Sequence, residues 1–171
     1  MQVEDATLEV TTLGCFEDDD FEAMAVPGIL AQLTALGDVA VGNAWKVFRY
    51  HDEPNVLIRY MPPYQGFSSS PLAMASAVEE ILRIAAQEEC SHLAITLGDV
   101  QSMGVPARAF HQGIANSLLH CLPRYRVIRH VSLVALNMTD KKTLDTVLSE
   151  CHPAAATMNS NDQDIGIAAI P

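Results

Sequence analysis

The feature that most constrains the fold is an alternation of short apolar runs with amphipathic segments in the second half of the chain. Residues 92–97 (HLAITL) and 130–136 (HVSLVAL) are continuous apolar runs of strand length, typical of strands covered on both faces. Apolar residues at helical spacing follow each run: Phe110, Ile114, Leu118 and Cys121 after the first, and Leu144, Val147, Leu148 and Cys151 after the second. Strands that alternate with helices run parallel, joined by right-handed crossovers, so this half predicts an α/β domain.

The first half adds four strand patterns and two helices. Strand patterns occupy 6–16 (ATLEVTTLGCF), 21–28 (FEAMAVPG), 44–50 (AWKVFRY) and 55–61 (NVLIRYM). A short helix is expected over residues 29–37, and a longer one from Pro71 to Cys90, with Ser70 as its N-cap. The complete order predicts a three-layer helix–sheet–helix sandwich around a mixed, mostly parallel central sheet.

Two local contacts are also expected from spacing. Glu79 lies four positions before Arg83 on the polar side of the longer helix, which favours an ion pair between them. Thr139 or Asp140 is expected to cap the last helix.

Length and charge limit the classes of partner. A chain of 171 residues with 49% hydrophobic residues can fill one core, which we place in residues 1–151, and residues 152–171 are expected to form a mobile tail. No apolar stretch is long enough to cross a membrane and no signal peptide is recognisable, so we expect a soluble cytoplasmic protein. The net charge of −11 disfavours bulk binding to nucleic acid and to anionic membranes.

The residues that usually carry chemistry form no known motif. The four cysteines are too widely spaced for a metal site and are expected to be reduced thiols, and the six histidines show no metal-ligand spacing. The serines of 67–71 (FSSSP) lack the frame of a nucleophile elbow. We therefore predict no catalytic residue, no metal and no cofactor.

A ligand site is expected where loops follow the carboxyl ends of the parallel strands. One such loop, 98–106 (GDVQSMGVP), has two glycines and precedes a helix, so its backbone N–H groups can approach a phosphate. The loop before the longer helix adds hydroxyl groups and two aromatic rings. The candidate binding residues are Gly98, Val100, Gln101, Ser102, Met103, Gly104, Val105, Tyr64, Phe67, Ser68, Ser69, Ser70, Pro27 and Gly28. The alternative is a turn that binds nothing, because Asp99 is negative and neither loop contains Lys or Arg.

Two segments resemble the macro domain, an ADP-ribose-binding α/β fold. They are residues 92–119, which contain the Gly104-Val105-Pro106 turn, and residues 130–150, in which Asp140 lies near the start of a helix. The N-terminal domain of leucyl aminopeptidases is similar. The resemblance implies a site for ADP-ribose or a related nucleotide. Cys15 stands where the family has an adenine-recognising aspartate, Pro27-Gly28 replace its asparagine-rich turn, and no glycine-rich catalytic loop lies between Gly28 and Trp45.

Three functional hypotheses follow. The first is a non-catalytic, macro-like module that binds an ADP-ribose-type or other nucleotide phosphate. The second is a ligand-free scaffold for protein–protein interaction, in which the acidic run 17–20 (EDDD) contacts a basic partner. The third is a divergent ADP-ribosyl hydrolase.

Overall fold

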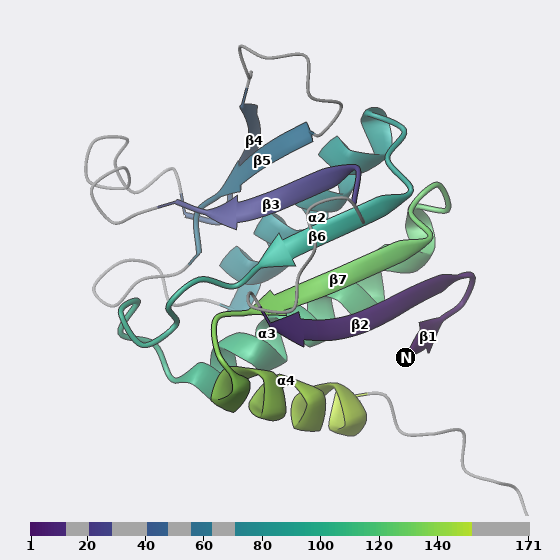
Figure 1. The fold of residues 1–171 in the computed structure, drawn as a ribbon. Helices are drawn as coiled ribbons and strands as arrows, with labels where there is room; N and C mark the ends of the chain where they lie inside the picture. The colour runs from purple at the N-terminus through teal and green to yellow at the C-terminus, as the bar shows by residue number, and fades with distance from the viewer. Residues whose placement is uncertain (13–20, 29–40, 48–55, 63–70, 152–171) are drawn as a thin grey trace, which may run out of the picture.

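The computed structural model describes residues 1–12, 21–28, 41–47, 56–62 and 71–151, which form a seven-stranded mixed sheet with three α-helices packed on it (Figure 1). The strands are β1 (Gln2–Val3), β2 (Ala6–Thr12), β3 (Ala23–Pro27), β4 (Ala44–Val47), β5 (Val56–Tyr60), β6 (His92–Thr96) and β7 (His130–Ala135). Their order across the sheet is β1-β2-β7-β6-β3-β5-β4. The predicted helix over 29–37 and the predicted tail over 152–171 lie outside the described residues.

Five neighbouring strands of this sheet, from β2 to β5, run parallel. The short strands at the two edges, β1 and β4, pair antiparallel with their neighbours. The apolar run 92–97 indeed forms the central strand β6, and Leu93, Ala94 and Ile95 are at most 1% exposed. The α/β class and the mostly parallel sheet are therefore confirmed, whereas β1 had no recognisable sequence pattern.

The helices α2 (Pro71–Gln87), α3 (Ala107–Cys121) and α4 (Met138–Cys151) pack side by side against one face of the sheet. Their apolar stripes meet alternate residues of the strands, such as Leu8, Ile58 and Val131, in one continuous core. The other face holds a smaller cluster around Ala94 and Val134. A helical layer on that second face remains a prediction that depends on residues 29–37. None of the described helices has the length and hydropathy of a membrane span.

The α2 helix ends earlier than the pattern predicted. Its last residue is Gln87, not Cys90, because Glu89 adopts a positive φ of 58° and the Cys90 N–H turns back to the Ala85 carbonyl at 3.0 Å. This backward hydrogen bond satisfies one of the final carbonyl groups of the helix and lets the chain turn toward β6.

The predicted pair between Glu79 and Arg83 does not form. Arg83 instead bonds Glu80, three positions earlier, with 2.7 Å between Nη2 and Oε2. Glu79 pairs with Arg124 of the short 3-10 helix η4 (Leu122–Arg124), at 2.9 Å between Oε1 and Nη1. Helical spacing allows Arg83 to pair with either Glu79 or Glu80. Because Glu79 pairs with Arg124, Arg83 pairs with Glu80.

The cap of α4 is also a different residue from those predicted. The Asn137 Oδ1 atom accepts the N–H groups of Thr139 and Asp140, both at 2.9 Å. Asp140 lies in the first turn instead, and its Oδ2 accepts the Asn137 side-chain N–H at 2.9 Å. The two side chains thus bond each other at the start of the helix.

Candidate functional site

The carboxyl ends of the parallel strands lie at one edge of the sheet, where the arrowheads of β2, β3, β6 and β7 point the same way (Figure 1). At this edge the end of β3 touches the start of the loop after β6. A Cβ atom built on Gly98 would lie 2.7 Å from the Pro27 Cγ atom, and Gly98 has a positive φ of 68°. Only glycine fits this position without strain, so the structure brings the predicted residues Pro27 and Gly98 together.

Hydrogen bonds join the ends of three strands at the same place. The Tyr60 hydroxyl donates to the Thr96 carbonyl at 2.9 Å, and the Thr96 hydroxyl donates to the Ala25 carbonyl at 3.2 Å. The Gly28 N–H donates to the Tyr60 carbonyl at 2.6 Å. The predicted residue Gly28 therefore continues the pairing between β3 and β5, which fixes where the following loops begin.

The predicted loop residues after β6 divide into two groups. Val100 and Met103 are buried, at 1% and 3% exposure, and their side chains belong to the core. Gln101, Ser102 and Gly104 are exposed, and Val105 is partly buried. Val100 and Met103 can therefore offer a ligand only backbone groups.

Four successive N–H groups of this loop already have acceptors within it. The Asp99 Oδ1 atom accepts the N–H groups of Gln101 at 3.1 Å and Ser102 at 3.3 Å. The Met103 N–H donates to the Val100 carbonyl and the Gly104 N–H to the Gln101 carbonyl, at 3.3 and 3.1 Å. A phosphate bound to the N–H groups of Gln101 and Ser102 would have to displace the Asp99 carboxylate.

The start of α3 has N–H donors without an acceptor in the described part of the chain. Pro106 precedes the helix, and none of the described side chains caps its first turn. The Phe110 N–H bonds the Pro106 carbonyl at 3.0 Å, so the N–H groups of the three residues before Phe110 have no acceptor within the helix. This end of α3 carries the positive end of the helix dipole.

Arg59 also lies at this edge, although no sequence pattern marked it as a ligand residue. It lies next to the last residue of β5 and is partly buried, and its Nη1 atom donates to the Pro27 carbonyl at 3.4 Å. Both loops singled out in the sequence lack a basic residue, so the only signal was an arginine inside a strand pattern. The cation comes from a strand, not from a loop.

The other predicted ligand residues cannot be placed beside these. Tyr64, Phe67, Ser68, Ser69 and Ser70 lie outside the described residues, as do Cys15 and the acidic run 17–20. The segment 29–40, in which the sequence shows no catalytic loop, lies outside them too.

No protein-family model matches this sequence, and no curated protein matches it. Solved structures do match. The Oceanobacillus iheyensis macrodomain with ADP is similar over 88% of this chain and 94% of its own, with a TM-score of 0.68 and 12% identity. The Trypanosoma brucei macrodomain in complex with ADP is similar over 82% of this chain and 67% of its own, with a TM-score of 0.63 and 12% identity. This chain has the macrodomain fold. The macro domain of ganglioside induced differentiation associated protein 2 covers 78% of this chain and 79% of its own, with a TM-score of 0.61 and 13% identity.

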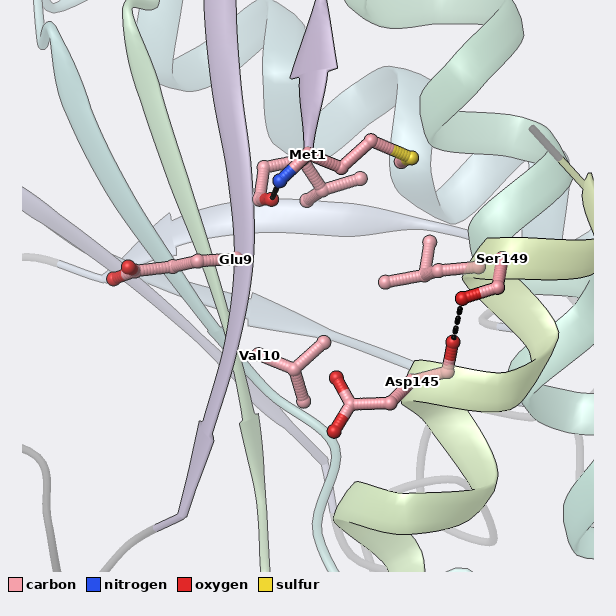
Figure 2. A pocket seen from close by; sticks show the side chains of 7 residues that line it. Met1, Glu9, Val10, Asp145 and Ser149 are labelled. Atoms are coloured by element: carbon pink, nitrogen blue, oxygen red, sulfur yellow. Dashed lines mark hydrogen bonds between the residues drawn. The ribbon is translucent and has the colours of Figure 1, made fainter. Parts of the chain in front are cut away.

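A pocket of about 520 Å³ lies elsewhere in this macrodomain fold, between β2 and α4 (Figure 2). Leu8, Val10 and Leu148 give it an apolar lining, and the Asp145 carboxylate points toward Val10. The acidic side chain that faces it is that of Asp145, whereas Figure 2 shows the Glu9 side chain pointing away from it on the other side of β2. None of the predicted ligand residues lines it.

One buried polar group lies near the start of the last helix of the macrodomain fold. His111 of α3 is 0% exposed, and neither ring nitrogen has a hydrogen-bond partner among the residues that the structure describes. Burial lowers the pKa of His111, while the nearby Asp140 carboxylate acts in the opposite direction. The described residues contain no group of three His, Cys, Asp or Glu side chains that could hold a metal ion.

Proposed function

We propose that this chain is a non-catalytic binding module for ADP-ribose or a related nucleotide phosphate, which binds at the carboxyl edge of the parallel strands. The macrodomain fold supports the choice of ligand, since macrodomains of this fold have been solved with ADP and with ADP-ribose. The observation that carries the proposal is the uncapped start of α3, which directly follows the glycine-containing loop after β6. Free N–H groups and a helix dipole at such a position attract a phosphate.

In this proposal the loop residues contribute mainly backbone. Gly98 and Pro27 bring the two loops close together, and Gly104 and Val105 lead the chain to the donors at the start of α3. Gln101 and Ser102 present exposed side chains to the same edge. The proposal also includes the rings of Tyr64 and Phe67, which can stack on a base or cover a ribose, and the hydroxyl donors of serines 68–70.

A second candidate is a ligand-free scaffold, and the Asp99 contacts favour it. A carboxylate that already occupies the Gln101 and Ser102 N–H groups makes the loop stable without any ligand. In that case the acidic run 17–20 is the feature proposed to bind a protein partner.

A calorimetric titration separates the two candidates. We expect saturable micromolar binding of ADP-ribose and weaker binding of AMP and inorganic phosphate. Gly104→Glu places a negative side chain at the exposed turn before α3 and should reduce the affinity at least tenfold.

Gly104→Ala is the matched control, because it introduces the same strain at the positive φ of 68° without charge or bulk. It should bind ADP-ribose nearly as well as the unmodified chain, with circular dichroism used to check that both variants fold. No heat from ADP-ribose at millimolar concentration would favour the scaffold, and equal affinity in the Glu variant would remove Gly104 from the site.

A further inference from the structure

We propose that Arg59 recognises a phosphate group of the ligand and thereby makes the site select phosphate-bearing nucleotides over uncharged nucleosides. This inference rests on the proposed function, whose ligand it defines further by charge. It assigns a role to a residue that belongs to a strand and to neither of the loops expected to hold the ligand.

The position of Arg59 follows from strand register. It lies opposite Val26 of β3 on one side and Trp45 of β4 on the other. Its Nη1 atom reaches the carbonyl of Pro27, one residue beyond Val26, so the guanidinium leans toward the carboxyl edge of the sheet. Pro27 also contacts Gly98. Arg59 and the loop after β6 therefore both lie next to the end of β3.

Arg59 differs from the other partly buried cations in how its charge is compensated. Within the described part of the chain, Lys46, Arg83 and Lys141 each have a carboxylate within 4.0 Å, and so do the exposed Arg108 and Arg124. Arg59 has none there, and its one hydrogen bond to a described residue is the 3.4 Å contact to Pro27. A guanidinium has five N–H donors, so most of its donor capacity is unused.

A partly buried arginine that has no carboxylate partner among the described residues is unexpected in a chain that carries 21 acidic and only 10 basic residues. An acidic partner could have been supplied at little cost, yet the residues opposite Arg59 in the sheet are Val26 and Trp45. A ligand oxyanion would supply the missing countercharge. The planar fork of a guanidinium matches two phosphate oxygens at once, which an ammonium does not.

The loop after β6 makes such a cation necessary. Its N–H groups from Gln101 to Gly104 are already bonded, and Asp99 adds a negative charge beside them. A diphosphate at this edge would therefore meet repulsion from the loop, which Arg59 can offset from the β3–β5 side.

The test compares Arg59→Gln and Arg59→Lys with the unmodified chain in calorimetric titrations of ADP-ribose, adenosine and inorganic pyrophosphate. Arg59→Gln should weaken ADP-ribose and pyrophosphate binding by roughly tenfold or more, as expected for lost charge-assisted hydrogen bonds. Adenosine affinity should stay within about twofold. Arg59→Lys keeps the positive charge but lacks the planar guanidinium, so its affinity for ADP-ribose and pyrophosphate should lie between those of the unmodified chain and Arg59→Gln.

Arg126→Gln is the charge-matched control, because Arg126 is exposed and lies between α3 and β7 at the opposite end of the strands. It should leave all three affinities unchanged, and thermal unfolding should confirm that every variant is folded. Equal ADP-ribose affinity in Arg59→Gln, or an equal loss for adenosine, would overturn the inference. If the unmodified chain binds pyrophosphate through Arg59 but binds no ADP-ribose, the phosphate-binding role of Arg59 stands, while the proposed nucleotide function and the selection among nucleotides fail. If it binds no phosphate compound, both fail.

Discussion

At the scale of single residues, the contact between Pro27 and Gly98 determines how closely the end of β3 approaches the loop after β6. Sequence alone predicted that both residues lie where a strand ends and a loop begins, since glycine and proline commonly mark the ends of strands. It could not identify Arg59, which lies 39 positions before Gly98, because only the pairing of β5, β3 and β6 brings the two to one edge. It also could not show that Asp99 bonds its own loop.

Gly98→Ala tests the close approach. The new methyl group would lie 2.7 Å from the Pro27 Cγ atom at a φ of 68°, so we expect a loss of about 1–3 kcal/mol in the free energy of unfolding. Urea unfolding measures this loss. Adding Pro27→Ala removes the Cγ atom and should therefore recover the part of the lost free energy of unfolding that comes from the steric clash. The part that comes from the positive φ of residue 98 should remain.

Gly113→Ala is the control for this substitution. Gly113 lies within α3, where a new Cβ would meet Met74 at an ordinary 3.6 Å. Alanine is the better helix former, so stability should be unchanged or rise by about 0.5–1 kcal/mol. A Gly98→Ala variant as stable as Gly113→Ala would show that the two loops adjust without cost.

At the scale of elements, sequence patterns predicted which described segments other than β1 become strands and helices, but not how the helices end. Apolar spacing located β6, β7, α3 and α4 because burial of one face dominates their energetics. Helix ends depend on single hydrogen bonds of about 1 kcal/mol, for which several neighbouring residues compete. Thus Asn137, and neither Thr139 nor Asp140, caps α4, and α2 ends at Gln87.

Asn137→Ala should therefore destabilise α4. It removes the acceptor of two backbone N–H groups and the donor to Asp140, so we expect a loss of about 1–2 kcal/mol in chemical denaturation. The matched control is Asn116→Ala, an exposed position within α3, where alanine should be neutral or slightly stabilising. An equal effect of both substitutions would mean that the Asn137 cap contributes nothing.

At the scale of the whole molecule, stability should depend on pH through groups that folding perturbs. Burial lowers the pKa of His111 below its ordinary value of 6.5, so the unfolded chain binds more protons in the window just below that value. Backbone N–H groups of Ser91 and His92 lower the pKa of Glu22 below 4.5. Both effects reduce stability on acidification, His111 first and Glu22 at lower pH.

The variant His111→Leu tests the upper part of this profile. Stability of the unmodified chain should fall as the pH drops below about 6.5, and the Leu variant should lack that fall. An apolar side chain also removes two buried nitrogens that have no hydrogen-bond partner in the described ranges, so the variant should be no less stable at pH 7. His120→Gln, exposed on the same helix, should keep the pH dependence. Identical profiles for His111→Leu and the unmodified chain would refute this role.

The pairing of β2 with β7 also has a consequence for synthesis on the ribosome. Glu9 and Ser132, which face each other across these strands, are 123 residues apart. At a synthesis rate of roughly 5–20 residues per second, β7 is made about 6–25 seconds after β2. During this time one edge of β2 is unpaired and open to strands of neighbouring nascent chains. Eight of the 21 acidic residues lie in the first 22 positions, so adjacent nascent chains repel each other during this interval.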